Sequence, residues 1–153
     1  MRIVGIIPAR MGSSRYPGKP METIHNMPMI GHCYHRTALS LGAENTYVAT
    51  CDTEIYEYIL SIGGKAIMTA NTHTRATTRT AEALEKIEVQ IDEKIDVVVM
   101  VQGDEPLIQP NTISETVLYF QDQRVNIVNI MSRLPTKEAF DDENNVKVVV
   151  NNN

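Results

Sequence analysis

Residues 3–20 have the sequence IVGIIPARMGSSRYPGKP, and this stretch decides the fold. It begins with a short apolar run at residues 3–7, which Pro8 closes. Such a run is typical of a β-strand that is buried on both faces, as in a parallel sheet covered by helices. The residues after Pro8 are rich in glycine and cationic side chains, so this first strand is expected to lead directly into a polar loop.

Beyond this stretch, the chain alternates between two hydrophobic periods. Apolar residues at three- and four-residue spacing predict helices, and short apolar runs predict strands. The expected helices cover residues 28–41, 55–62, 80–91 and 113–120, and the expected further strands cover residues 47–50, 66–68, 97–101, 127–130 and 147–150. Strands that alternate with helices predict βαβ units, and therefore an α/β fold with a mostly parallel, Rossmann-like sheet.

Length and composition restrict the class of protein. The 153 residues suffice for a single domain over residues 1–153. The formal net charge of −5 argues against a nucleic-acid partner, and no apolar run approaches the roughly 20 residues that span a bilayer. The two cysteines form no disulfide framework. We therefore expect a cytoplasmic protein without a membrane segment.

The loop after the first strand has the chemistry of an anion site. Glycines let backbone amides approach an anion, hydroxyls add donors, and cations supply charge-assisted hydrogen bonds to phosphate oxygens. The residues concerned are Gly12, Gly18, Ser13, Ser14, Arg10, Arg15 and Lys19. The spacing matches neither a Walker loop nor a dinucleotide fingerprint. The alternative is a flexible, solvated basic loop.

A second candidate is VQGDEP at residues 101–106, directly after the most apolar expected strand. Mg²⁺ binds through one or two carboxylates together with substrate phosphates, so Asp104 is a candidate metal ligand. Glu105 would point in a different direction in an extended segment, and we expect only one of the two to face a site. The alternative is a polar strand end that turns at Pro106.

The segment at residues 73–83 is a third candidate. Arg75 and Arg79 are four residues apart, and they share a helix face if the helix begins early. Thr77 or Thr78 is a candidate helix cap. A capping segment with solvated arginines explains this pattern as well as ligand contact does.

Six motifs, in this order and at these separations, resemble the 3-deoxy-manno-octulosonate cytidylyltransferases (CMP-Kdo synthetases). They are IIPARMGSSRYPGKP, MPMIGHCYHRT, YVATCD, GGKAIMT, VQGDEPLI and VKVVV, and the resemblance covers essentially the whole chain. It implies the nucleotide-diphospho-sugar transferase fold, and the activation of a 2-keto-3-deoxy sugar acid by CTP for lipopolysaccharide or capsule synthesis. It also implies Mg²⁺ as cofactor and a homodimer in the full-length form.

The resemblance assigns roles residue by residue. Arg10 and Lys19 resemble the triphosphate contacts and the catalytic cations. Asp104 resembles the magnesium ligand, and Gln102 the contact to the sugar acid. The nucleotide-binding set implied in this way is Ala9, Arg10, Gly12, Ser13, Ser14, Arg15, Lys19 and Arg79.

Two departures from the family leave alternatives open. Arg75 and Ala76 stand where the family has serine and glycine, so the choice of base stays open and another sugar acid is an alternative substrate. Family members also continue well beyond residue 150, and there they supply a second metal carboxylate and much of the sugar site. We therefore expect that this chain lacks the family's C-terminal part, and a nucleotide-binding fragment without turnover is the other alternative.

Overall fold

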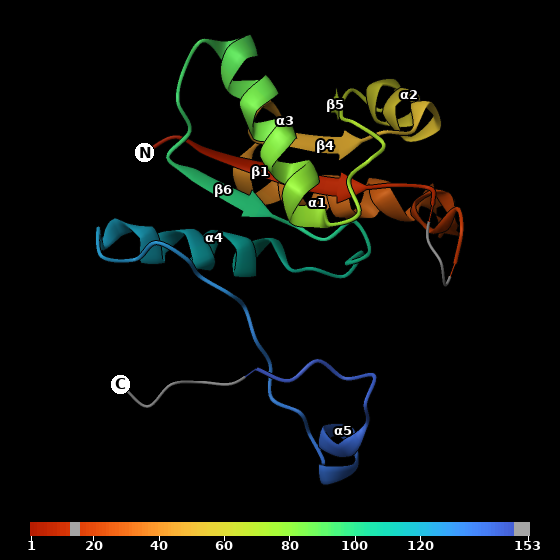
Figure 1. The fold of residues 1–153 in the computed structure, drawn as a ribbon, viewed down its shortest axis with the longest axis vertical. Coiled ribbons are helices and arrows are strands. Elements are labelled where there is room, and N and C mark those ends of the chain that lie inside the picture. Colours follow the sequence, from red (N-terminus) through yellow and green to blue (C-terminus); the bar gives the residue numbers. More distant parts are fainter. Residues whose placement is uncertain (13–15, 149–153) are drawn as a thin grey trace.

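The protein is an α/β structure built on a parallel sheet of four strands in the order β5-β4-β1-β6 (Figure 1). This computed structural model describes residues 1–12 and 16–148. The strands of the sheet are β1 (Ile3–Ala9), β4 (Thr46–Thr50), β5 (Lys65–Met68) and β6 (Val97–Met100). A small antiparallel hairpin pairs β2 (Thr23–Ile24) with β3 (Met27–Pro28). The expected α/β class with a parallel sheet is confirmed.

Four helices cover the two faces of the sheet: α1 (Met29–Leu41), α2 (Thr53–Ser61), α3 (Ala76–Ile91) and α4 (Pro110–Leu118). A short α5 (Lys137–Asp141) lies away from the sheet (Figure 1). Single 3₁₀ turns lie at η1 (Lys19–Met21), η2 (Ala43–Asn45) and η3 (Tyr119–Gln121). The helix α3 packs on one face, whereas α1, α2 and α4 contribute to the core on the other (Figure 1).

The central strand β1 supplies both halves of the core by alternation. Val4 and Ile6 belong to the cluster that contains α3, whereas Ile7 and Ala9 belong to the cluster that contains α1, α2 and α4. Successive side chains of a strand point to opposite faces, so a strand buried on both sides must be apolar at every position. This is why residues 3–7 form an uninterrupted apolar run.

The strand β1 continues through Pro8 to Ala9, two residues beyond the boundary that the sequence predicts. Pairing with β6 ends at Ile6, whose carbonyl accepts from the amide of Val101 at 3.1 Å. Pro8 lies two residues after Ile6, so the amide hydrogen that proline lacks would point towards the β6 side of the strand. The pairing of β1 with β6 has already ended there. Pro8 therefore costs no sheet hydrogen bond there, although it lies in a central strand.

Two sequence expectations and part of a third are wrong; they concern one helix cap and two strands. The helix α3 begins at Ala76, so Thr77 and Thr78 lie inside its first turn and neither caps it. The expected strand at residues 127–130 is absent, because this apolar segment pairs with no strand in the described part of the chain. Of the expected strand at residues 147–150, the first two residues are not in a strand, and the others lie outside the described residues.

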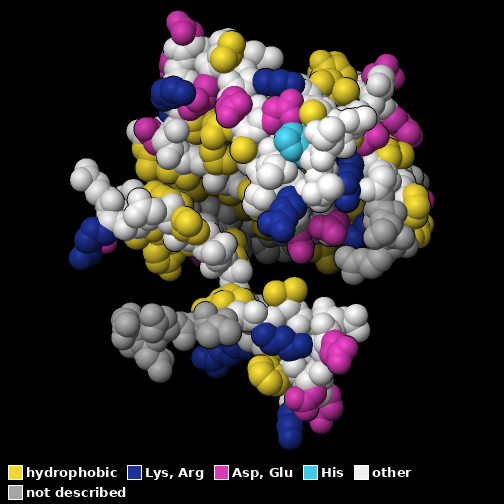
Figure 2. Space-filling model, in the orientation of Figure 1, with side chains coloured by type: hydrophobic (Ala, Val, Ile, Leu, Met, Phe, Trp, Pro, Cys, Tyr) yellow, Lys and Arg dark blue, Asp and Glu magenta, His cyan; other side chains and the backbone are white. Residues whose placement is uncertain are grey.

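The segment after η3 leaves the α/β body and leads to α5 (Figure 1). Figure 2 shows acidic and basic side chains interspersed on the visible face of the body, with hydrophobic side chains gathered along its lower part and on the part containing α5. Ile127, Ile130 and Phe140 are among the exposed apolar residues of this segment. No helix in residues 1–12 and 16–148 is long and apolar enough to cross a membrane.

Candidate functional site

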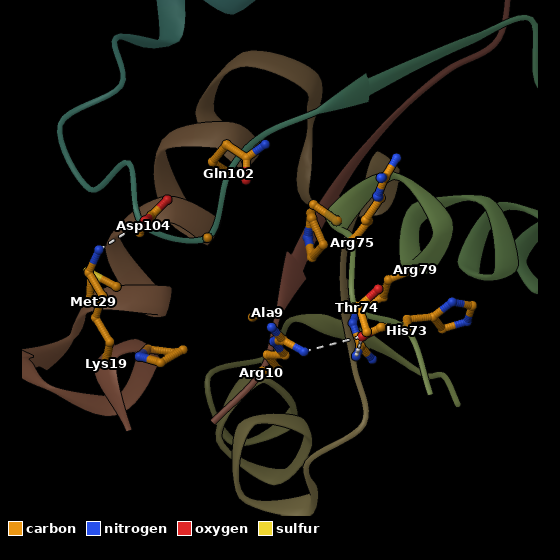
Figure 3. Close-up of a pocket in the computed structure, with 14 residues that line it drawn as sticks. Ala9, Arg10, Lys19, Met29, His73, Thr74, Arg75, Arg79, Gln102 and Asp104 are labelled. Carbon is orange, nitrogen blue, oxygen red and sulfur yellow. Dashed lines mark hydrogen bonds and ion pairs between the residues drawn. The ribbon is translucent and has the colours of Figure 1, made fainter. Parts of the chain in front are cut away.

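A cavity of about 290 Å³ opens beyond the carboxyl ends of β1 and β6 (Figure 3). The connection after β1 leads to β4 on one side of β1, and β6 lies on its other side. Ligands of open parallel sheets bind at such a point, where the strand order reverses. The cavity is lined by Pro8, Ala9, Arg10, Lys19, Pro20, Met29, His73, Thr74, Arg75, Ala76, Arg79, Gln102, Gly103 and Asp104.

The first wall comes from the end of β1 and the loop that follows. Arg10 is the first residue after the strand, and Lys19 begins η1. The amide of Gly18 donates to the carbonyl of Met11 at 2.9 Å, which closes the loop between them. Gly18 has φ 79, a left-handed conformation that glycine adopts without steric cost. The loop therefore returns Lys19 to the cavity that Arg10 enters.

The second wall is the turn that follows β6. The amide of Glu105 donates to the carbonyl of Gln102 at 3.2 Å, and this turn directs Gln102 and Asp104 to the cavity while Glu105 does not line it. A Cβ at Gly103 would lie 2.7 Å from the carbonyl oxygen of Pro8. Only glycine therefore allows the turn to approach the end of β1 this closely.

The third wall is the connection between β5 and α3, together with the first turn of α3. His73, Thr74, Arg75 and Ala76 line the cavity from this side. Arg79 is only 2% exposed, and its guanidinium donates to the hydroxyl of Thr69 and to the carbonyls of residues 70 and 73. Arg79 thus holds this connection in place as well as lining the cavity.

The cavity wall is strongly basic for an acidic chain. Four cationic side chains line it, namely Arg10, Lys19, Arg75 and Arg79, against the single carboxylate of Asp104. Lys19 Nζ donates to Asp104 Oδ2 at 2.9 Å, and Arg10 donates to the carbonyl of His73 at 3.4 Å (Figure 3). Cations concentrated in a concave site attract an anionic ligand.

Asp104 fits a metal that is held jointly by the protein and a bound phosphate. The described residues contain no group of three or more His, Cys, Asp or Glu side chains that could hold a metal alone. Mg²⁺ is commonly held by one or two carboxylates plus substrate phosphates, and one aspartate in a cavity lined by cations is compatible with such a site. The fully buried Cys33 offers no thiolate nearby, because burial is the main cause that raises the pKa of its thiol to about 11.

The structure brings together six of the residues that the sequence nominates: Ala9, Arg10, Lys19, Arg79, Gln102 and Asp104. Gly12 does not line the cavity, and Ser13, Ser14 and Arg15 lie outside the described residues. The first four residues of the third candidate segment, residues 73–76, line it as well. Met29 lines it without having been nominated.

Three comparisons relate the chain to known proteins. An 8-amino-3,8-dideoxy-manno-octulosonate cytidylyltransferase from Shewanella sp. is 39% identical over 100% of this chain and 62% of the relative. A 3-deoxy-manno-octulosonate cytidylyltransferase from Thermodesulfovibrio yellowstonii is 37% identical over 100% of this chain and 61% of the relative. The chain thus spans about three fifths of the length of these curated relatives.

Among solved structures, CMP:2-keto-3-deoxy-manno-octonic acid synthetase complexed with CTP matches with a TM-score of 0.69 and 38% identity. The match covers 81% of this chain and 49% of that one. The fold and the basic cavity at the strand ends thus define a protein of the nucleotidyltransferase class. The family model for cytidylyltransferases matches residues 4–153, and the chain belongs to this family.

Proposed function

We propose that this protein takes part in the transfer of CMP from CTP to 3-deoxy-manno-octulosonate, with release of pyrophosphate. The observation that supports this most directly is the cavity that places Arg10, Lys19 and Asp104 together at the switch point of a cytidylyltransferase fold. The oxygens of a metal-bound triphosphate accept hydrogen bonds from cationic side chains, and its metal ion binds a carboxylate.

In this proposal, Arg10 and Lys19 bind the triphosphate and offset the charge that develops on the leaving pyrophosphate. The anomeric hydroxyl of the sugar acid attacks the α-phosphorus in line, so a new P–O bond forms as the bond to the bridging oxygen of the β-phosphate breaks. Gln102 borders the cavity beside Asp104 and contacts the sugar acid. Ala9, at the end of β1, lies against the nucleotide, and Gly12, Ser13, Ser14, Arg15 and Arg79 complete the proposed nucleotide site.

Asp104 holds Mg²⁺ in this proposal, and the ion supplies Lewis-acid stabilisation of the phosphate oxygens. Lys19 takes up only part of the acceptor capacity of this carboxylate, but its ammonium opposes the approach of a second cation. A triphosphate reduces this opposition, because it offers Lys19 a new anionic partner.

Two sugar acids are candidates for the acceptor. One relative is named for 3-deoxy-manno-octulosonate and another for its 8-amino-3,8-dideoxy analogue. Arg75 and Ala76 line the cavity at the position where the resemblance is weakest, and they are the residues that we expect to influence this choice. We favour 3-deoxy-manno-octulosonate, with the amino analogue or another sugar acid as the alternative.

A second candidate function is binding of the nucleotide without turnover. It concerns residues 1–153 taken by themselves, which span 62% of the length of the relative. Catalytic groups act as a unit, so loss of some of them lowers the rate by far more than a proportionate share. We therefore expect residues 1–153 to bind CTP and Mg²⁺ and to turn over slowly.

Other parts of the proposal rest on the family resemblance. They are a single nucleotidyltransferase domain over residues 1–153, a homodimer in the full-length form, a place in the cytoplasm, and a product used in lipopolysaccharide or capsule synthesis. Light scattering of the purified protein tests the proposed assembly.

The experiment that tests the function measures Mg²⁺-dependent binding of CTP, UTP, ATP and GTP by calorimetry. Pyrophosphate release is then followed with both sugar acids. We expect CTP to bind most tightly and Asp104→Asn to abolish the Mg²⁺ dependence. Glu105→Gln is the matched control, since its side chain is adjacent but does not line the cavity. Tighter binding of UTP or GTP would overturn the assignment to CTP, and loss of the Mg²⁺ dependence in Glu105→Gln would overturn the role of Asp104.

A further inference from the structure

The connection between β5 and α3, residues 69–75, forms one wall of the cavity without regular secondary structure. Three side chains on α3 hold it: Arg79, which also lines the cavity, and Glu82 and Lys86, which do not line it. They are three and four residues apart, so they share one face of the helix. Lys86 Nζ donates to the carbonyl of Met68 at 2.7 Å, where β5 ends.

Glu82 makes the densest set of these contacts. Its two carboxylate oxygens accept from the amide of Ala70 at 3.0 and 3.2 Å, and one of them pairs with Lys86 Nζ at 2.7 Å. The same carboxylate accepts from Nε2 of His73. Hydrogen bonds from Lys86, from the amide of Ala70 and from His73 lower the pKa of Glu82 to about 2, so the carboxylate is ionised across the physiological range.

His73 connects this cluster to the cavity, because its ring and its backbone carbonyl have different partners. Its ring is bonded to Glu82, whereas its carbonyl oxygen accepts from Arg10 Nη1 at 3.4 Å and from Arg79 Nη2 at 3.5 Å. Figure 3 shows the ring of His73 directed away from Arg10, while a dashed line joins Arg10 to the backbone of His73. Glu82 itself does not line the cavity.

We propose that Glu82 is a positioning residue for the nucleotide site: through the ring of His73 it fixes the carbonyl that orients the guanidinium of Arg10. This inference rests on the proposed function, in which Arg10 contacts the triphosphate. A guanidinium has five donors, so one bond to the carbonyl of His73 sets its direction and leaves the other donors for phosphate oxygens.

A loss of orientation and a loss of charge at Glu82 change the affinity for an anion in opposite directions, and this makes the proposal testable. Glu82→Gln removes a negative charge near a basic cavity, which by Coulomb attraction alone strengthens the binding of an anion. Loss of the orientation of Arg10 weakens it. The direction of the change therefore separates positioning from a general effect of charge.

The test measures binding of CTP with Mg²⁺ by calorimetry in Glu82→Gln, in Arg10→Ala and in the double variant. We expect Glu82→Gln to weaken binding by about threefold to tenfold, the range of one or two neutral hydrogen bonds. In the Arg10→Ala background the same change should not weaken binding, because the group that it orients is gone. Glu85→Gln, at an exposed position of the same helix, is the matched control and should bind like the wild type.

A second variant keeps the test decisive if Glu82→Gln unfolds. His73→Phe retains the backbone carbonyl and removes Nε2, and it should weaken binding by a similar factor. Thermal unfolding of each variant establishes that it is folded at the temperature of the titration. Unchanged or tighter binding in a folded Glu82→Gln variant, or the same loss with and without Arg10, would overturn the positioning role. A wild-type protein that binds no CTP would instead remove the proposed function itself, and the inference with it.

Discussion

Replacing Lys19 with methionine is expected to change the affinities for metal and for nucleotide in opposite directions. Lys19 Nζ lies 2.9 Å from Asp104 Oδ2, so the proposed phosphate-binding cation and the proposed metal ligand are partners of one another. A metal ion that binds alone meets the positive charge of Lys19 beside this carboxylate, which weakens its binding. A metal-bound triphosphate gives each of the two side chains a new partner.

The magnitudes follow from exposure and from the type of contact. The side chains of Lys19 and Asp104 are 42% and 50% exposed, and such pairs contribute about 0.2–1 kcal/mol. Lys19→Met should therefore tighten binding of a divalent ion alone by at most about fivefold. It should weaken binding of CTP by roughly tenfold to a hundredfold, because one charge-assisted contact contributes about 1.5–3 kcal/mol.

Two titrations check this prediction. Mn²⁺ alone is followed by the electron paramagnetic resonance signal of the free ion, and CTP in constant Mg²⁺ is followed by calorimetry. Lys94→Met is the matched control, since it removes an ion pair of 2.6 Å with Glu88 on α3 and does not touch the cavity. Weaker Mn²⁺ binding in Lys19→Met would refute the competition for Asp104, and unchanged CTP affinity would refute the role of Lys19 as a phosphate contact.

Two further predictions concern stability. Gly103→Ala should lower the free energy of unfolding by about 1–3 kcal/mol, because the new Cβ would lie 2.7 Å from the carbonyl oxygen of Pro8. Urea unfolding measures this, with Gly12→Ala as control because its Cβ meets nothing within 4 Å, and equal losses in the two variants would contradict the steric explanation. The second prediction concerns pH: the pKa of Glu82 is lowered from 4.5 to about 2 in the fold, so its ionised form stabilises the protein above pH 4.5. The stability difference between wild type and Glu82→Gln should be constant above that pH and disappear as the pH falls towards 2, and a difference that persists at pH 2 would contradict this cause.

Much of the α/β architecture could be predicted because burial leaves a periodic signal in the sequence. Helix α1 ends at Leu41, as its apolar stripe and Gly42 indicate. The apolar runs at residues 3–7 and 97–101 mark the two strands whose ends border the cavity. A strand covered by helices on both faces has to be apolar throughout, and a covered helix has to repeat its apolar residues every three to four positions.

The hairpin of β2 and β3 shows where local patterns give too weak a signal. His25 and Asn26 both have positive φ at its two-residue turn, with values of 47 and 64. This is the backbone of a turn that joins two strands tightly, usually formed by Asn-Gly or Gly-Gly. Histidine in the first position weakens that signal, and strands of two residues each have no measurable period.

What the sequence by itself determined was the class of fold and the presence, after two buried strands, of a loop sequence rich in glycine and cations and of an aspartate. These depend on local order along the chain: apolar period, glycine, charge and the family's motifs. Only the tertiary structure decided that Lys19 is paired with Asp104, that residues 127–130 form no strand, and that His73 connects Arg10 to Glu82. Strand pairing and side-chain partners depend on which distant segments come into contact. Arg10 and His73 are 63 residues apart, and the local sequence around each residue does not indicate that the two are in contact.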